Sequence, residues 1–263
     1  MGAAAMSVKV TLVDINPKMI AAWRDTFEEN PEVTILHGSM IDQDVSAWVS
    51  PTNAGGRMDG GLDGVIKKFL GAGIEHAVQK QIGARYGGAM PVGHATCVPT
   101  GRPSPRFLIS TPTMVASSED VSDSMNVALA AAAAFQAVHM QNATNPGSIT
   151  SIALPGLGAN TGRVPPEICA DLMWTAYDLF RSAQLPDFQT MRAALEGLLG
   201  DLGPATTTYK KSFVHPNLPS AHKPTVPDSA AAQAQLKKQI AAAQKDALED
   251  DKDFEDEDFD DFE

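Results

Sequence analysis

The chain has 263 residues, of which 43% are hydrophobic and 20% charged, and its formal net charge at pH 7 is −12. This length allows one large domain or one domain with extensions, and the hydrophobic content suffices for a sizeable core. Every apolar stretch is interrupted by proline, glycine or a charged residue before it reaches about 18 residues, so we expect no transmembrane helix.

A few residue types indicate where the protein is located and whether it binds a metal. The two cysteines, Cys97 and Cys169, are too few for a disulfide scaffold or a structural zinc site. The histidines show no spacing typical of metal ligands, so we expect no metal and no other cofactor. Residues 1–10 lack the basic and long apolar regions of a secretory signal. These features favour a reducing, cytoplasmic location.

The acidity belongs to one end of the chain. Residues 246–263 contain 12 acidic residues and one lysine, whereas residues 1–245 carry 20 acidic and 19 basic residues. A nucleic-acid-binding body usually has a basic surplus, so we expect no nucleic-acid binding by this body. The acidic run is either a solubilising end or a peptide whose Phe254, Phe259 and Phe262 dock into a basic groove of a protein partner.

Short β-branched runs alternate with longer helical patterns along the body. We predict strands at residues 8–13, 33–36, 47–50, 95–98, 107–110 and 149–154. We predict helices at residues 18–29, 62–82, 122–141 and 167–183, and one more within residues 183–203. Strands separated by crossover helices predict an α/β fold with a mostly parallel central sheet and helices on both of its faces.

The composition divides the chain into three parts. Residues 1–203 are expected to form the folded domain. Residues 204–228 contain five prolines and no apolar period, which is typical of a linker. Residues 229–263 begin with an alanine-rich segment expected to be helical and end in the acidic run, which self-repulsion should keep disordered. The last two parts together predict a flexible C-terminal extension.

A glycine-rich loop follows the predicted strand that ends at Ser50. In parallel sheets, ligands bind at the carboxyl ends of strands. Gly60 and Gly61 lead directly into a helix, whose free N–H groups favour an anionic or polyhydroxyl ligand. Asn53 and Asp63 are the polar side chains of this loop best placed to bind hydroxyls. The structural alternative is that Asp63 simply interacts with the helix dipole in the first turn.

A second glycine-rich loop, PGLGANTGRVP, follows Leu154. Its glycines expose backbone N–H groups just before a helix, an arrangement that binds phosphates. No Gly-Lys-Ser/Thr follows, so this is not a Walker A loop. Two such loops at two strand ends of one sheet predict a ligand with a diphosphate that lies across the sheet edge.

Four segments, in order, resemble motifs of the macro domain, the ADP-ribose-binding module. They are residues 45–53 with Gly60-Gly61-Leu62-Asp63-Gly64-Val65-Ile66, residues 91–101, residues 107–112 and residues 155–165. The resemblance covers about residues 33–182 and implies a three-layer α/β/α fold over residues 1–203.

The resemblance also implies roles for individual residues. Asn53 matches the family asparagine that hydrogen-bonds the distal ribose, and Asp63 matches an aspartate of the hydrolytic, MacroD-like members. Both are therefore the expected catalytic residues. The expected ligand-binding residues are Asp14, Ile15, Ser39, Met40, Asn53, Gly60, Gly61, Leu62, Gly158, Ala159, Asn160, Thr161 and Gly162.

Three features depart from the family pattern. The aspartate that binds adenine falls on Ser39, and the aromatic residue that covers the distal ribose falls on Gly162. The family's terminal strand and helix are missing after the fourth motif, but residues 10–14 and 18–29 resemble that pair. We therefore hypothesise a circular permutation, in which Asp14 replaces the acceptor lost at Ser39. The hypothesis is wrong if residues 8–13 lie at a sheet edge, away from both residues 33–36 and residues 149–154.

The resemblance implies a protein that binds ADP-ribose and hydrolyses it from modified macromolecules or related derivatives. Asp63 would position or deprotonate the attacking water, with no metal required. One alternative is a non-catalytic ADP-ribose reader. Another is a protein-interaction or virion-associated factor that uses the macro fold as a scaffold.

Overall fold

The computed structural model describes residues 8–199. The predicted linker at residues 204–228, the alanine-rich segment and the acidic tail lie outside the described residues.

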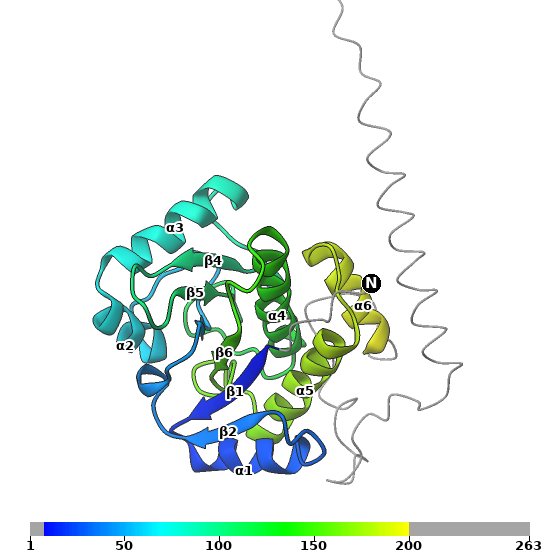
Figure 1. The fold of residues 1–263 in the computed structure, drawn as a ribbon. Helices are drawn as coiled ribbons and strands as arrows, with labels where there is room; N and C mark the ends of the chain where they lie inside the picture. Colours follow the sequence, from blue (N-terminus) through cyan, green and yellow to red (C-terminus); the bar gives the residue numbers. More distant parts are fainter. Residues whose placement is uncertain (1–7, 200–263) are drawn as a thin grey trace, which may run out of the picture.

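A six-stranded sheet forms the centre of the molecule, in the order β2-β1-β6-β3-β5-β4 (Figure 1). The strands are β1 (Lys9–Asp14), β2 (Thr34–His37), β3 (Ala47–Ser50), β4 (Thr96–Pro99), β5 (Phe107–Ser110) and β6 (Ser151–Leu154). Neighbouring strands are parallel except at the edge, where β4 is antiparallel to β5. The predicted mostly parallel sheet is thus confirmed.

Strand β1 lies inside the sheet and pairs on both sides. Its Val13 is in register with Leu36 of β2, and its Leu12 is in register with Leu154 of β6. This pairing is the one that the circular-permutation hypothesis requires, because β1 lies next to both of the strands named in it. The first strand of the chain therefore ends beside the residues that follow β2 and β6.

The helices follow the predicted order with one error. They are α1 (Pro17–Thr26), the short 3-10 helix η1 (Met40–Asp42), α2 (Gly61–Leu70), α3 (Gly73–Tyr86), α4 (Asn126–Thr144), α5 (Pro166–Ser182) and α6 (Phe188–Leu198). The single helix predicted at residues 62–82 is wrong, because it is two helices, α2 and α3. Gly71 adopts φ +97°, a conformation that ends α2 and that glycine adopts without steric cost.

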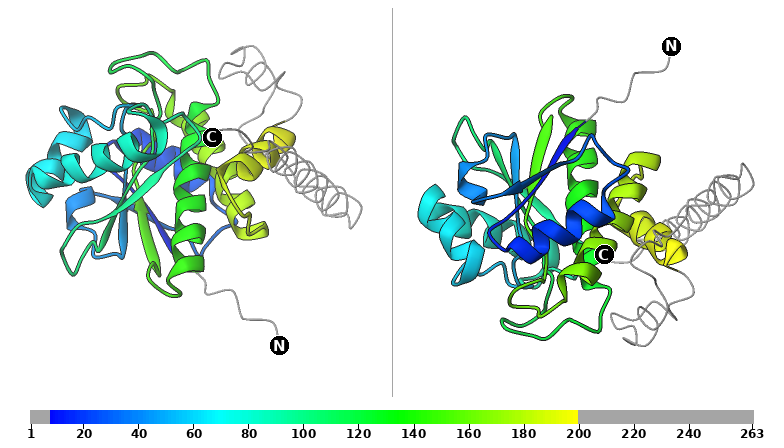
Figure 2. Two further views of the ribbon diagram at one scale, coloured as in Figure 1. Left: turned by 90° about the horizontal axis from the view of Figure 1, so that it is seen from above. Right: turned by 90° about the horizontal axis from the view of Figure 1, so that it is seen from below.

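The two faces of the sheet pack against different helices. Leu12, Val49 and Ile152 belong to one core cluster with residues of α1, α4, α5 and α6. Trp48 and Ala153, their alternating neighbours, belong to a second cluster with residues of α2 and α3. Figure 2 shows α2 and α3 on one side of the strands and α4 to α6 on the other. The fold is a three-layer α/β/α arrangement, as the alternation of side chains along buried strands requires.

Helix α4 is the most deeply buried helix. The run of alanines in it, Ala128 to Ala134 apart from Leu129, is at most 3% exposed. Methyl side chains let the helix backbone approach the sheet and α5 closely, so this run is explained by packing.

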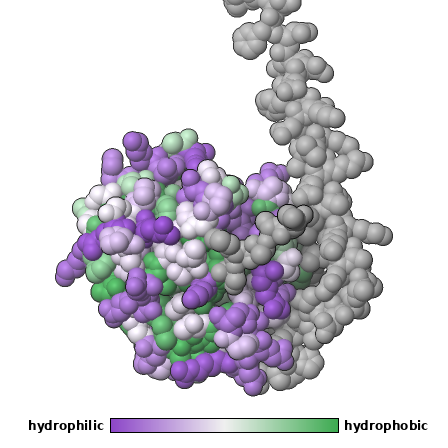
Figure 3. Space-filling model, in the orientation of Figure 1, coloured by the Kyte–Doolittle hydropathy of each residue, from purple (hydrophilic) through white to green (hydrophobic). Residues whose placement is uncertain are grey.

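The outer surface of the described body is mixed in character. Hydrophilic residues surround much of the outline in Figure 3, and hydrophobic residues gather nearer the middle of that face. Within residues 8–199, no helix combines the length and the apolar character needed to cross a bilayer.

Replacing Ala131 by leucine should destabilise the protein by about 1–3 kcal/mol, because three extra carbons must enter a filled core. Ala131 is 0% exposed. The matched control is Ala21→Leu on the exposed side of α1, which should change stability by less than about 0.5 kcal/mol. Urea denaturation measures both, and equal stability of the two variants would contradict the packing of α4.

Candidate functional site

A cleft of about 330 Å³ opens at the carboxyl ends of the parallel strands. Residues that follow β1, β2, β3, β5 and β6 contribute to it, together with the first turn of α2. Parallel strands place their following loops at one edge of the sheet, so distant segments meet there. The lining residues are Val13, Asp14, Ile15, Gly38, Ser39, Met40, Pro51, Gly60, Gly61, Leu62, Asp63, Val65, Thr113, Met114, Pro155, Gly156, Gly158, Asn160, Thr161 and Gly162.

The cleft brings together all of the predicted site residues except Asn53 and Ala159. Ala159 packs instead against the larger core cluster. Sequence reasoning missed Thr113 and Met114, which enter the cleft from the segment after β5. The glycine signals that identified the other two loops are absent from this segment.

Asp63 lies at the third position of α2, with its carboxylate near the end of β3. The Ser50 hydroxyl, on the last residue of β3, donates a hydrogen bond of 2.5 Å to Asp63 Oδ1. Ser50 itself is fully buried. The strand end therefore fixes the orientation of this carboxylate relative to the cleft.

Burial raises the pKa of Asp63 to about 6. Loss of hydration disfavours the charged form, and this effect outweighs the Ser50 hydrogen bond, which lowers the pKa. The nearby charge of Asp59 raises the pKa further. A carboxylate with a pKa near neutrality is suited to take a proton from water, because such a group is both ionised and basic at physiological pH.

The N-terminus of α2 presents backbone donors to the cleft. Gly60 is the N-cap residue and supplies no side-chain cap, so the first N–H groups of the helix lack an internal partner. Gly60 has an extended backbone, with φ −162°, and no atom beyond its two chain neighbours lies within 4 Å of where its Cβ would be. The open space beside Gly60 leaves this helix end accessible to a ligand.

Packing explains why glycine occupies position 162, where the family resemblance leads one to expect an aromatic residue. A Cβ on Gly162 would lie 2.7 Å from both the Gly158 carbonyl oxygen and the Val121 side chain. The Gly162 carbonyl accepts a hydrogen bond from the Val121 N–H, at 3.1 Å, which holds the loop against the segment after β5. No side chain fits at this position, so the distal end of the cleft has no aromatic cover from this loop.

Asp14 joins the ends of two neighbouring strands. Its Oδ1 accepts the N–H of Asn16 at 2.8 Å, and its Oδ2 accepts the N–H of Gly156 at 3.1 Å. A Cβ on Gly156 would lie 2.9 Å from Asp14 Oδ2, so glycine is needed there for this approach. Because β1 and β2 are parallel neighbours, Asp14 lies beside the segment that contains Ser39, where the family pattern has its adenine-binding aspartate.

Asn53 braces the loop that leads to α2. Its Oδ1 accepts the N–H groups of Gly55 and Arg57, at 3.0 and 3.3 Å, and its Nδ2 donates to Ser117 Oγ at 3.0 Å. These bonds connect the loop after β3 to the loop after β5. Its expected contact with a ribose stays a prediction, since Asn53 is not among the residues that line the cleft.

The charged side chains that line the cleft are the carboxylates of Asp14 and Asp63, and none of the lining residues is Lys, Arg or His. An anionic ligand would therefore be held by backbone N–H groups and helix N-termini rather than by cationic side chains. Within residues 8–199, no group of three or more His, Cys, Asp or Glu side chains is arranged to hold a metal ion.

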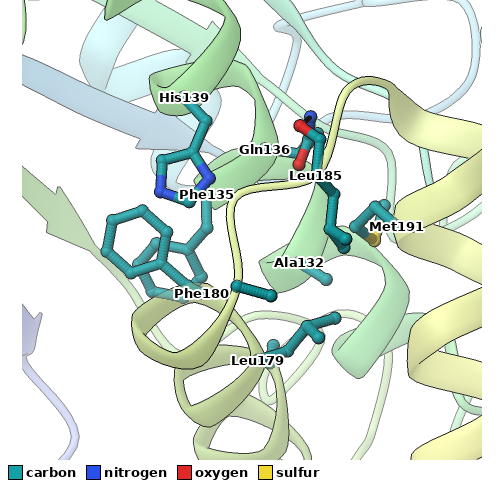
Figure 4. A pocket seen from close by; sticks show the side chains of 10 residues that line it. Ala132, Phe135, Gln136, His139, Leu179, Phe180, Leu185 and Met191 are labelled. Atoms are coloured by element: carbon teal, nitrogen blue, oxygen red, sulfur yellow. Dashed lines mark hydrogen bonds between the residues drawn. The ribbon is translucent and has the colours of Figure 1, made fainter. Parts of the chain in front are cut away.

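A second cavity lies between α4, α5 and α6. His139 and Phe135 each stack on Phe180 there, and Gln136 donates a hydrogen bond to the Leu185 carbonyl (Figure 4). Its volume of about 10 Å³ is at the lower limit for one water molecule, so this cavity is a packing gap and not a ligand site.

The causes of the Asp63 shift predict opposite effects for two substitutions. Ser50→Ala removes the hydrogen bond that stabilises the carboxylate, so the pKa of Asp63 should rise above about 6. Asp59→Asn removes a repelling charge, so the pKa should fall. Carboxyl carbon chemical shifts followed by NMR across pH 3–9 measure both. A shift in the same direction in both variants would contradict this account.

Sequence comparisons identify the family. A family model for the macro domain matches residues 49–173. An uncharacterised protein of Aquifex aeolicus (strain VF5) is 30% identical over 143 residues, which cover 54% of this chain and 78% of that protein. A macro domain-containing protein of Streptomyces griseus is 32% identical over 82 residues, 31% of this chain and 46% of that protein.

Two solved macrodomain structures are similar to parts of this chain. The macrodomain of Mycobacterium tuberculosis DarG has a TM-score of 0.46 and 22% identity, over 54% of this chain and 86% of that one. An Oceanobacillus iheyensis macrodomain with ADP has a TM-score of 0.46 and 16% identity, over 56% of this chain and 75% of that one. The family model spans the loops after β3, β5 and β6, whereas β1, β2 and the segments that follow them lie before the matched residues. The family assignment rests on this model together with the Aquifex aeolicus relative, most of whose length this chain covers. The chain belongs to the macro domain family.

Proposed function

We propose that the protein binds ADP-ribose in the cleft at the strand ends and hydrolyses ADP-ribose from a modified macromolecule or a related derivative. The observation that carries this proposal is the Asp63 carboxylate. It is oriented by Ser50, has a pKa of about 6, and lies beside the open N-terminus of α2. A carboxylate that only interacted with the helix dipole would not need a buried hydroxyl partner at the end of β3.

The diphosphate is assigned to the loop at residues 156–162. Three backbone hydrogen bonds define the curvature of this loop, namely Ala159 N–H to Gly156 O, Arg163 N–H to Asn160 O and Val164 N–H to Gly158 O. Asn160, Thr161 and Gly162 lie on its cleft side. In such a curved loop the backbone N–H groups converge on an anion, which suits a cleft lined by no cationic side chain.

The side chains at each end of the cleft indicate which end of the ligand binds there. Asp14 and Ser39 supply acceptors for the amino group of adenine, and the side chain of Ile15, 75% exposed at the cleft, offers an apolar surface for the base. The distal ribose then lies at the opposite end, near Gly60, Gly61 and Asp63.

Hydrolysis in this pose needs one proton transfer to the protein. Water forms a bond to the anomeric carbon of the distal ribose as the bond from that carbon to the leaving group breaks. The water proton passes to the Asp63 carboxylate, and the leaving group takes a proton from solvent or from the protonated Asp63. General-base assistance of this kind contributes about 10²–10⁴-fold to rate.

Gly60→Glu should weaken ADP-ribose binding by about a hundredfold or more. The new side chain would enter the open space at the α2 N-terminus, and its charge would repel the phosphates. The backbone of Gly60 is extended, a conformation that any residue can adopt. The melting temperature of the variant should therefore stay near that of the wild type.

The matched control for this test is Gly83→Glu, which adds the same charge at an exposed, open position on α3. Calorimetric titration with ADP-ribose should give wild-type affinity for this control. Unchanged affinity of Gly60→Glu would place the ligand elsewhere.

Asp63→Asn should lower turnover of an ADP-ribosylated substrate about a hundredfold or more while ADP-ribose affinity stays within a few-fold. In the wild type, turnover should fall as pH drops below about 6, because protonated Asp63 cannot accept a proton. Single-turnover assays across pH 5–8 measure both effects.

Asp59→Asn is the control for charge, because Asp59 is exposed and does not line the cleft. It should retain turnover and move the acid limb of the pH profile to lower pH. Wild-type turnover in Asp63→Asn would remove the catalytic assignment. Tight ADP-ribose binding with no turnover by the wild type on any modified substrate would favour the reader alternative instead.

A further inference from the structure

One polar group in the cleft is left without a partner by the fold. Within residues 8–199, the buried side-chain atoms with no hydrogen-bond partner are Trp23 Nε1, Thr96 Oγ1, Thr113 Oγ1 and Asn126 Oδ1. Thr113 is the one of these residues that lines the cleft. Its side chain is therefore the buried, unsatisfied group next to the proposed ligand.

The backbone of Thr113 is held on both sides. Its N–H donates to the Thr52 carbonyl at 3.2 Å, and its carbonyl accepts from Asn126 Nδ2 at 2.9 Å. The residue lines the cleft but is only 1% exposed, so its hydroxyl is shielded from bulk water. Leaving a buried hydroxyl unsatisfied costs free energy, so a ligand oxygen that accepted its hydrogen bond would remove that cost.

The neighbours of Thr113 connect it to the diphosphate loop. Asn126, which holds the Thr113 carbonyl, precedes Val127 at the start of α4. The Val127 side chain lies beside Gly158, where an added Cβ would meet it at 3.2 Å. Thr113 thus belongs to the structural unit that supports residues 158–162.

We propose that the Thr113 hydroxyl is a further ligand-binding group, which donates a hydrogen bond to an oxygen of the bound ligand. That oxygen belongs either to the diphosphate or to the distal ribose. A hydroxyl suits both, since it donates to a phosphate oxygen and both donates to and accepts from a ribose hydroxyl. This inference rests on the proposed function and extends it to a residue outside both glycine-rich loops.

Thr113→Val tests the proposal, because it removes the hydroxyl with little change of shape. We expect a loss of about tenfold in ADP-ribose affinity, measured by calorimetry, with an unchanged melting temperature. Thr113→Ser, which keeps the hydroxyl, should bind ADP-ribose within about twofold of the wild type. Titration with ADP distinguishes the two oxygens: a diphosphate contact weakens both ligands, and a ribose contact weakens ADP-ribose alone.

The structure offers a closely matched control. Thr96 on β4 is also 1% exposed and also has an unpartnered hydroxyl, but it does not line the cleft. Thr96→Val should therefore leave the affinity unchanged. Thr113→Ala is a second hydroxyl-free variant, which should reproduce the loss of affinity if Thr113→Val does not fold.

The outcomes separate this inference from the proposed function. Wild-type affinity in a folded Thr113→Val or Thr113→Ala variant, with clear ADP-ribose binding by the wild type, would overturn the role of Thr113 alone. Equal losses in Thr113→Val and Thr96→Val would overturn it too, because the effect would then be structural. No ADP-ribose binding by the wild type would overturn the proposed function, and this inference with it.

Discussion

The cleft depends on the pairing of β1 between β2 and β6. This pairing places Asp14, near the start of the chain, within hydrogen-bonding distance of the N–H of Gly156, 142 residues later. It also brings residues 38–40 to the same edge of the sheet. Without β1 in that position, the segments after β2 and β6 would not share a wall, and the proposed adenine end of the cleft would not exist.

Close backbone approach is the second constraint on the site, and it governs the loop at residues 156–162. Gly156 admits the Asp14 carboxylate, and Gly162 admits the Gly158 carbonyl and the Val121 side chain. Each of these contacts leaves no room for a Cβ. The loop therefore has a tight curve but no side chains at these two positions. The groups left to bind an anion there are its backbone N–H groups.

Two opposing effects set the pKa of Asp63. Burial disfavours its charge, whereas the Ser50 hydroxyl stabilises that charge, and the balance leaves the pKa at about 6. The Asp63 carboxylate and its orienting partner come from different elements, α2 and β3. The connection from β3 to α2 brings Ser50 and Asp63 together. It therefore influences both the orientation of the Asp63 carboxylate and its pKa.

The sequence by itself determined the α/β class, the mostly parallel sheet and the two glycine-rich loops, because β-branched runs, helical periods and glycines act locally. The split between α2 and α3 followed from the backbone conformation of Gly71, which the helical pattern around it concealed. Only the tertiary structure decided that Asn53 braces two loops, that Ala159 packs against the core cluster, and that Thr113 lies at the cleft with an unpartnered hydroxyl. These outcomes depend on contacts between segments far apart in the chain, and no local pattern encodes which neighbour a side chain will meet.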